Sequence, residues 1–511
     1  MYEEKILVID YGSQYTQLIA RRIRENKTYC EVLKPELLNN VKTDKSIIGV
    51  ILSGGPNSVS KDNQYDLPDI LFENDIPILG ICFGMQLICK KFNGKVKEST
   101  SREYGKSKLE IIQNNKIFEG LENSIEVWMS HGDSVIKCPT NFSILATTNK
   151  EGLSAIKLND NDIYGIQFHP EVTHTLDNGK IIFNFVNNIC KSKAEWTTKN
   201  IIARQINSIK EKVKTDHVIL GLSGGVDSSV AAAIIHKAIQ DQLTCIFIDN
   251  GLLRLNEKIK VQNSFKHFNM NIKYVDSSAI FLERLKGITD PEEKRKIIGK
   301  TFIDVFQTEA KKIKNVKWLA QGTIYPDVIE SAASSDNAHL IKSHHNVGGL
   351  PKDMDLKLLE PLRELFKDEV RKLGIDIGVE SRLINRHPFP GPGLAVRILG
   401  EVKVEYANIL RKADDIFIEM LNEKKLYNNV SQAFAVFMPV KSVGVTGDGR
   451  SYGNVVSLRA VKTIDFMTAK PFEFPFNFLE EVSTRIINEV PEISRVCLDI
   501  SSKPPATIEW E

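Results

Sequence analysis

At 511 residues, the chain is too long for one hydrophobic core, and its length suggests about three domains. Lys and Arg together number 67 against 65 Asp and Glu, so the chain lacks the basic excess of nucleic-acid-binding proteins, and small charged metabolites are the expected ligands. Seven scattered cysteines without a CxxC pair indicate a reducing, cytoplasmic location and argue against a zinc site. No apolar run approaches the roughly 20 residues that span a membrane, so no membrane association is expected.

The first third of the chain, residues 1–195, alternates strand-like and helix-like segments. Apolar strands are predicted at 6–9, 47–52, 76–81 and 163–168, and turns or helical stretches follow them. This alternation is typical of an α/β fold with a mainly parallel sheet, in which functional residues gather at the carboxyl ends of the strands.

Cys82 lies where such a sheet would display a nucleophile. The segment 80–84, GICFG, has the form of a nucleophile elbow, in which a strained strand-to-helix turn exposes the central side chain. A free cysteine in an apolar run is more often simply buried. The strand at 163–168, however, delivers His169 and Glu171, and a thiol needs a base that is itself oriented by an acceptor. Together with an SGGP turn after the second strand, these residues indicate a thiol active site.

In these features, residues 1–195 resemble the class I glutamine amidotransferases. The resemblance implies that Cys82 attacks the carboxamide of glutamine, that His169 acts as base and then as acid, and that Glu171 orients it. It also implies an oxyanion hole formed by the backbone N–H groups of Gly55 and Phe83. The positions that match the glutamine-binding residues of the family are Gln86, Ser130, His131, Gly132 and Asp133. Without the resemblance, 130–133 would be assigned to an ordinary polar loop.

The middle third contains the segment 218–229, VILGLSGGVDSS, which reads as strand, tight turn and helix. Such a turn directs backbone N–H groups and the positive end of a helix dipole at one point, where glycines let a phosphate approach. It is not a Walker P-loop, because Gly-Lys-Ser/Thr occurs only at 105–107 and 299–301, without the glycine required upstream. Three further strands between 243 and 320 end in polar residues, which should meet at one crevice.

The SGGVDSS string resembles the signature of the N-type ATP pyrophosphatases, which have a doubly wound α/β domain. The resemblance implies that pyrophosphate is held by Ser223, Gly224, Gly225, Val226, Asp227, Ser228 and Ser229. Mg²⁺ bound with ATP is the one cofactor expected, without a tightly bound organic cofactor. Its candidate ligands are Asp227, Asp327 and Glu330, although the last two, three apart on a helix, also fit a solvated acidic face. The polar stretch 334–351 is predicted to be a mobile loop that could close over this site.

The last third, residues 387–511, has an α+β pattern. It opens with HPFPGPG, which predicts a rigid, non-helical linker. Helices are predicted at 404–426 and 478–490, and strands at 433–439, 452–460 and 495–500. The tail KPPATIEWE closes the chain, and because chain ends are usually frayed, a tail without function is the simpler expectation.

The three signatures, in this order, resemble the glutamine-hydrolysing GMP synthetase family over the whole chain. The resemblance implies domains at 1–195, 196–386 and 387–511, the last a smaller one that forms a homodimer and completes a nucleotide site. It implies the substrates glutamine, ATP and xanthosine monophosphate (XMP), with adenylation of XMP at O2, release of pyrophosphate, and displacement of AMP by ammonia to give GMP. The positions implied for XMP are Arg295, Gln432, Arg495, Lys503, Ile508 and Glu509.

Three other functional classes compete with this interpretation. A glutamine-dependent NAD synthetase shares the SGG loop, but its glutaminase is of a different type and is not expected to contain Cys82, His169 and Glu171. A tRNA-thiolating enzyme is disfavoured by the near-neutral charge. A glutamine or nucleotide sensor on the same scaffold would not need all three proposed catalytic residues.

Overall fold

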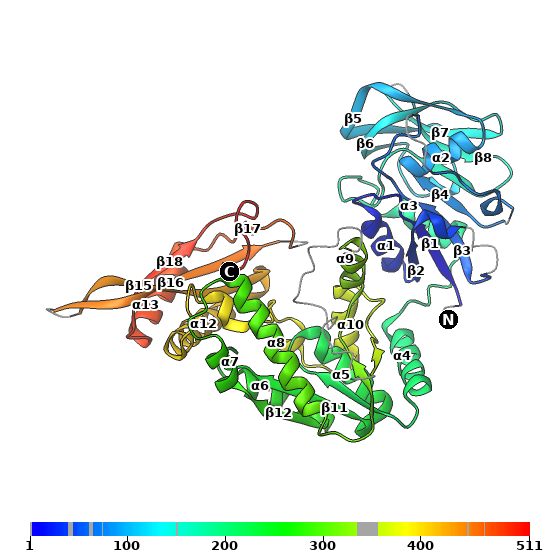
Figure 1. Ribbon diagram of the computed structural model, residues 1–511. Helices are drawn as coiled ribbons and strands as arrows, with labels where there is room; N and C mark the ends of the chain where they lie inside the picture. Colours follow the sequence, from blue (N-terminus) through cyan, green and yellow to red (C-terminus); the bar gives the residue numbers. More distant parts are fainter. Residues whose placement is uncertain are drawn as a thin grey trace. The chain divides into compact units, whose positions relative to one another are not determined.

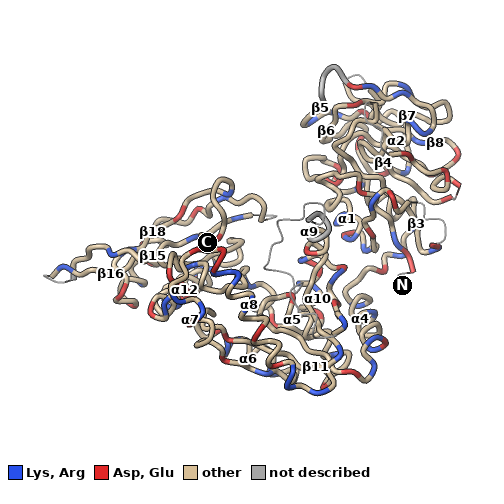
Figure 2. Tube along the Cα trace, in the orientation of Figure 1, with Lys and Arg blue, Asp and Glu red and all other residues tan. Residues whose placement is uncertain are grey.

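The computed structural model describes residues 3–38, 44–60, 65–73, 75–149, 152–334, 356–446, 449–463 and 466–511. The chain divides into two compact units, Met1–Asn200 and Ile201–Glu511 (Figure 1). Basic and acidic residues are interspersed along the chain trace of both units (Figure 2). Among the described residues, no helix combines the length and the apolar character needed to cross a bilayer.

The first unit is built on a nine-stranded mixed sheet in the order β2-β1-β3-β4-β9-β8-β7-β5-β6. Its parallel half comprises β2 (Cys30–Leu33), β1 (Lys5–Ile9), β3 (Ile47–Leu52), β4 (Ile78–Ile81) and β9 (Ile163–Ile166). Its antiparallel half comprises β8 (Leu153–Leu158), β7 (Phe142–Thr148), β5 (Lys95–Ile111) and β6 (Ser124–Lys137). The predicted parallel strands are confirmed, whereas the antiparallel half lies outside the sequence expectations.

Apolar runs and stripes explain the packing of this unit. Ile6, Val8 and Ile9 of β1 are fully buried, because a strand covered on both faces reads as a continuous apolar run. Helix α1 (Thr16–Glu25) buries Ile19 and Ile23, which lie one turn apart on the same face. Other helical segments described in the unit include α2 (Phe83–Lys91), α3 (Lys180–Phe183), a π-helical turn at Asn184–Ile189, and 3₁₀ turns at Asp69–Leu71 and Lys116–Phe118.

The second unit carries a five-stranded parallel sheet in the order β12-β11-β10-β13-β14. Its strands are β10 (His217–Gly221), β11 (Leu243–Asp249), β12 (Ile272–Asp276), β13 (Val316–Ala320) and β14 (Lys357–Leu359). The chain leaves β10 through β11 and β12 and then returns to β13 on the other side of β10. Open α/β sheets bind ligands at such a reversal, beyond the carboxyl ends of the two central strands. The carboxyl ends of β10 and β13 are therefore the expected place of the predicted crevice.

Helices flank this sheet and connect its strands (Figure 1). Asp290 caps α8, since its side chain accepts the N–H of Glu293 at 2.8 Å, and Pro291 fills the first helical position. The helices are α4 (Thr198–Val213), α5 (Val226–Ile239), α6 (Glu257–Phe265), α7 (Ser278–Arg284), α8 (Pro291–Ala310), α9 (Tyr325–Ser334), α10 (Lys367–Ile377) and α11 (Ser381–Ile384).

The carboxyl-terminal part of the second unit has the predicted α+β composition. Its elements are α12 (Val404–Glu423), β15 (Gln432–Thr446), β16 (Gly449–Lys462), β17 (Lys470–Pro471), α13 (Phe476–Glu489) and β18 (Ile493–Asp499). Ile246 and Phe281 share one buried cluster with Phe417 and Val456, so residues on both sides of position 386 pack together. The two boundaries between the three predicted domains stay predictions.

The tail is ordered against the rest of its unit. The indole Nε1 of Trp510 donates to Oδ2 of Asp499 at 2.9 Å, and Arg459 donates to the carbonyl of Thr507 at 3.0 Å. These contacts hold the last residues of the chain in place, so this chain end is not frayed.

Candidate functional site

Cys82 occupies a sharp turn between β4 and α2. Its φ of 52° lies in the left-handed region, which costs a residue with a Cβ conformational energy. Two glycines make the turn possible. A Cβ on Gly84 would lie 2.4 Å from the carbonyl oxygen of Leu52, and one on Gly80 would lie 2.6 Å from the Gly84 backbone. The strand, turn and helix predicted around Cys82 are therefore present, and the residue is buried.

His169 and Glu171 follow β9 and form a buried pair. Nδ1 of His169 lies 2.7 Å from Oε1 of Glu171. Burial alone would lower the pKa of His169, but the charge of Glu171 and a side-chain hydrogen bond with Cys82 together hold this pKa well above its ordinary value. The ring of Tyr15 meets the imidazole edge-on, with 5.0 Å between ring centres. The structure thus brings together the thiol, the imidazole and the carboxylate of the three predicted residues.

A cavity of about 580 Å³ opens beside this group. Phe83 begins α2, so its N–H has no acceptor within the helix. Gly55 admits no side chain, because a Cβ there would lie 2.9 Å from the carbonyl oxygen of Tyr11. The predicted residues that line the cavity are Gly55, Cys82, Phe83, Gln86, Ser130, His131, Gly132, Asp133 and His169.

The stretch 130–133 belongs to strand β6, so the alternative assignment to a polar loop is wrong. His131 is buried, and its Nε2 lies 3.3 Å from Oε2 of Glu103, its register partner on β5. Gln86 is also buried and donates from Nε2 to the carbonyl of Asp133 at 2.8 Å. Cross-strand pairing therefore holds this wall of the cavity.

Gln167 is a buried residue beside Cys82 that sequence reasoning missed. Its Nε2 lies 3.7 Å from Sγ of Cys82, and its Oε1 lies 3.5 Å from Nε2 of Gln86. The signal available in the sequence is its spacing, because it precedes His169 by two positions in an extended segment and so points to the same side.

The SGGVDSS turn joins β10 to α5 in the second unit. Gly224 has a φ of 76°, a conformation that favours glycine. The hydroxyl oxygens of Ser223 and Ser228 lie 2.9 Å apart, and the Ser223 N–H donates to Oγ of Ser228 at 3.3 Å. Helix α5 begins at Val226, so N–H groups without helical acceptors converge at the turn. The predicted strand, tight turn and helix are therefore present.

Asp227 stands between this turn and two other elements. Gly322, just after β13, packs so closely that a Cβ would lie 2.8 Å from the carbonyl carbon of Asp227. Oδ2 of Asp227 lies 2.6 Å from Nζ of Lys367 at the start of α10, a cation that sequence reasoning missed. Oδ1 of Asp227 is buried and, within the described part of the chain, has no hydrogen-bond partner.

The other predicted magnesium ligands are only partly described. Oδ2 of Asp327 accepts the N–H of Ile324 at 3.0 Å at the start of α9. The Glu330 side chain and the predicted mobile loop from residue 335 onward lie outside the described residues. Among the side chains that are described, no group of three or more His, Cys, Asp and Glu is arranged to hold a metal.

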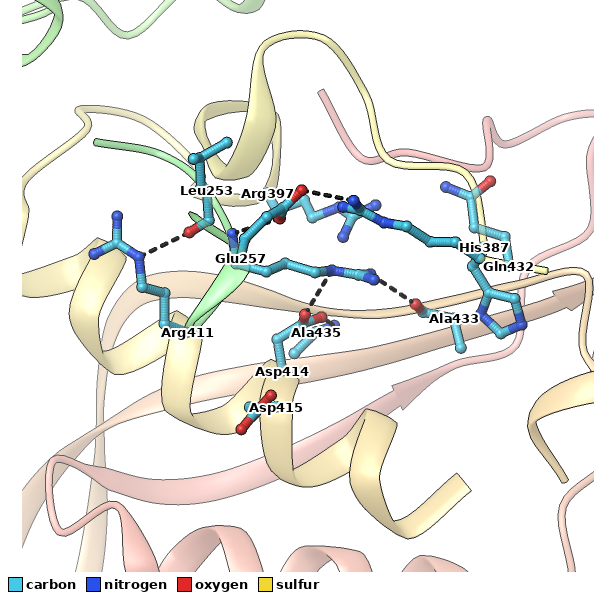
Figure 3. Close-up of polar contacts among 12 residues, drawn as sticks. Leu253, Glu257, His387, Arg397, Arg411, Asp414, Asp415, Gln432, Ala433 and Ala435 are labelled. Carbon is cyan, nitrogen blue, oxygen red and sulfur yellow. Dashed lines mark hydrogen bonds and ion pairs between the residues drawn. The ribbon is translucent and has the colours of Figure 1, made fainter. Parts of the chain in front are cut away.

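Two of the residues predicted for the acceptor nucleotide meet at the carboxyl terminus. Nε2 of Gln432 donates to Oε1 of Glu509 at 2.7 Å. Arg397 binds the same carboxylate through Nε at 3.0 Å and Nη2 at 2.8 Å. Ile508 is buried in a small cluster with Phe434. Figure 3 shows Gln432 near Arg397 in a region crowded with arginine, aspartate and glutamate side chains.

The remaining predicted nucleotide residues are spread along the unit. Arg295 donates to the carbonyl of Glu511, close to the tail. Lys503 donates to the carbonyl of Phe466 at 2.7 Å. Sequence reasoning grouped all of these residues in one site. Lys503 belongs to the tail itself, and the structure brings Arg295 to the last residue of the tail.

Arg495 lies elsewhere in the same chain. Arg495 pairs with Val455 in the sheet register, whereas Gln432 pairs with Val461 of the same strand. That separation along β16 corresponds to roughly 20 Å at about 3.3 Å per residue. The exposed Arg495 donates instead to Oγ of Ser442 at 2.8 Å.

Comparison with known proteins assigns a class to each part of the chain. Family models match residues 7–189 as glutamine amidotransferase class-I, residues 200–295 as NAD synthase and residues 419–510 as GMP synthase C terminal domain. The fold and the two sites therefore define a class I glutamine amidotransferase joined to an ATP-utilising synthetase.

Full-length relatives narrow this class. A protein of Photobacterium profundum is 56% identical over 521 residues, covering 100% of this chain and 99% of that protein. A protein of Aliivibrio fischeri is 55% identical over 513 residues, with the same coverage. Both carry the name GMP synthase (glutamine-hydrolyzing), and the present chain belongs to this family.

Proposed function

We propose that this chain makes GMP from XMP, ATP and glutamine. The observation that carries the proposal is the presence of two separate reactive sites in one member of this family. The first unit holds the buried Cys82, His169 and Glu171 together, and the second holds an anion-binding turn at the switch point of a parallel sheet. A thiol site releases ammonia from an amide, and a turn of this kind accepts phosphate.

In the first unit, Cys82 attacks the side-chain carbonyl carbon of glutamine. His169 takes the thiol proton and gives it to the leaving nitrogen, so the C–N bond breaks and ammonia leaves a glutamyl thioester. Water then cleaves the thioester with His169 as base, while Glu171 holds the imidazole orientation. The N–H groups of Gly55 and Phe83 stabilise the oxyanion. Glutamine is bound by Gln86, Ser130, His131 and Gly132.

In the second unit, O2 of XMP attacks the α-phosphorus of ATP, and pyrophosphate leaves into the turn at 223–229. The N–H groups of the turn and the ammonium of Lys367 receive its charge. The adenylated oxygen is now a good leaving group, so ammonia attacks C2 and expels AMP, giving GMP after loss of a proton.

Mg²⁺ fits beside the turn, because Oδ1 of Asp227 has no hydrogen-bond partner among the described residues and a carboxylate oxygen is a ligand that Mg²⁺ prefers. Asp327 and Glu330 are the further candidates. When bound with ATP, the ion offsets the negative charge of the phosphates.

The acceptor nucleotide is recognised by the carboxyl-terminal part of the chain. Gln432, Ile508 and Glu509 contact the base or ribose, with Arg295 nearby. The phosphate is held by Lys503, since an ammonium suits a phosphate. The predicted role of Arg495 at the same phosphate does not fit its place on β18, roughly 20 Å from Gln432 along the sheet.

The same part of the chain forms a homodimer. Val443, Val445 and Tyr452 share one face of the β15–β16 hairpin, and they are 50%, 80% and 63% exposed. An exposed apolar face on a two-stranded hairpin is typical of a protein interface.

All seven cysteines are unpaired, which supports a reducing, cytoplasmic location.

The products test the synthetase half directly. XMP, ATP, Mg²⁺ and an ammonium salt should give GMP, AMP and pyrophosphate in equal amounts. Formation of ADP and inorganic phosphate would contradict adenylation. The NAD synthase model covers this same region, so deamido-NAD with ATP and ammonium is the control acceptor, and we expect no product from it.

A further inference from the structure

Arg397 follows the HPFPGPG stretch, to which neither proposed reaction assigns a role. The segment Gly393–Arg397 is a buried 3₁₀ helix docked on the loop after β11. Gly393 has a φ of 65°, and a Cβ there would lie 2.4 Å from the carbonyl oxygen of Leu252. The N–H of Leu394 donates to this same oxygen at 2.8 Å. The stretch is therefore held by close backbone contact rather than serving as a spacer.

The side chain of Arg397 is fully buried between two aromatic rings. Its guanidinium carbon lies 4.1 Å from the ring centre of Phe434 and 5.1 Å from that of Phe389. Guanidinium groups favour such positions over aromatic faces, and the rings leave the fork little freedom to rotate. Its direction is set before any ligand arrives.

The guanidinium group of Arg397 donates two hydrogen bonds to the carboxylate of Glu509. Nε and Nη2 each take one carboxylate oxygen, at 3.0 Å and 2.8 Å, which is the parallel two-bond arrangement of an arginine and a carboxylate. Gln432 donates to the same carboxylate at 2.7 Å. The Glu509 side chain keeps 18% exposure, so it retains a free edge. Arg397 itself has no exposed surface with which to touch a ligand.

We propose that Arg397 is a positioning residue for the acceptor nucleotide, acting only through Glu509. It aims the carboxylate at the N–H or O–H donors of the nucleotide, and it neutralises a charge that would otherwise repel a phosphate-bearing substrate. The inference rests on the proposed function, in which Glu509 contacts XMP.

The test is a kinetic double-mutant cycle of Arg397→Lys and Glu509→Gln in the full-length protein, with ammonium as donor. Lysine keeps the charge but loses the fork. Arg397→Lys should raise KM for XMP roughly tenfold, the scale of a charge-assisted hydrogen bond, and leave KM for ATP within about twofold. In the Glu509→Gln background the same change should alter KM for XMP by less than about twofold.

Arg459→Lys is the matched control. Arg459 is also fully buried and holds the same tail, but through the backbone carbonyls of Thr507 and Ile508. Any effect of this change should be equal in both backgrounds. If Arg397→Lys behaves in the same way, or raises KM for ATP equally, Arg397 only supports the tail and the inference is overturned.

Two further outcomes have defined meanings. If Glu509→Gln leaves KM for XMP unchanged, Glu509 is not a nucleotide residue, and the inference falls while GMP synthesis stands. If the wild type makes no GMP, the proposed function itself is wrong.

Should Arg397→Lys fail to melt cooperatively, Phe434→Leu replaces it in the cycle, because that change removes the nearer ring without altering charge. Phe434→Leu should raise KM for XMP by a smaller factor, leave KM for ATP unchanged, and lose its effect in the Glu509→Gln background. An equal rise of KM for XMP with Glu509 and with Gln at position 509 overturns the inference.

Discussion

His169 experiences two opposing effects. Burial disfavours the imidazolium, but the Glu171 carboxylate and the Cys82 thiol favour it, and the balance raises the pKa of His169. A raised histidine pKa stabilises the folded protein fully at pH values below the unfolded pKa of about 6.5. That contribution is lost as the pH rises through the folded pKa.

Glu171→Gln should therefore lower the pKa of His169, which NMR of ring-labelled histidine measures against the wild type. Its cost in the free energy of unfolding should be largest below pH 6.5 and should shrink as the pH rises. Glutamine-dependent GMP formation should fall on the order of 10⁴-fold, the scale seen when the orienting acid of such a triad is made neutral. Ammonium-dependent formation should be unchanged, and an unchanged histidine pKa would show that Glu171 does not act on this ring.

Residues whose chemistry demands partners could be predicted from the sequence. Cys82 requires a base and an acceptor, so a search for both leads to His169 and Glu171. Lys367 and Arg397 carry no such local requirement. Their partners, Asp227 and Glu509, are distant in sequence, and only the folded sheet and the docked tail bring them together.

At the scale of elements, the turn at Cys82 depends on close packing at the first residues of α2. Gly84→Ala would place a Cβ 2.4 Å from backbone, and because backbone cannot move aside cheaply, the change should destabilise the first unit by roughly 1–3 kcal/mol and abolish glutaminase activity. Gly299 is the matched control. It lies in α8, and a Cβ added there would meet nothing within 4 Å, so Gly299→Ala should stabilise the second unit by up to about 1 kcal/mol.

Thermal unfolding followed by calorimetry measures both changes. A Gly84→Ala variant that melts like the wild type and still hydrolyses glutamine would contradict the close packing at the turn.

The parallel strands could be predicted because they are continuous apolar runs. Only part of β6 could be predicted. Its buried positions alternate regularly through Val127, Met129, His131 and Asp133. The last two are polar. Nε2 of His131 lies 3.3 Å from Oε2 of Glu103 on β5, and Asp133 accepts hydrogen bonds from the hydroxyls of Ser58 and Ser60. A pattern read from hydrophobicity alone therefore ends at Met129 and assigns the rest to a loop.

For the whole molecule, the exposed hairpin face predicts the oligomeric state. Val445→Glu should convert the proposed dimer to a monomer at micromolar concentration, because a carboxylate buried in an apolar contact loses its hydration. Ile259→Glu, on the exposed face of α6, is the control and should remain dimeric. Light scattering after size exclusion gives the mass of each. A wild type that is already monomeric would contradict the proposed dimer.

The central claim is that one chain joins two reactions through ammonia. GMP formation from XMP, ATP and Mg²⁺, with either glutamine or an ammonium salt, should be measured for the wild type and for Cys82→Ala. We expect the wild type to use both donors and the variant to use ammonium alone at the wild-type rate. A variant that still uses glutamine would contradict the role of Cys82, and a wild type that makes GMP from neither donor would contradict the account as a whole.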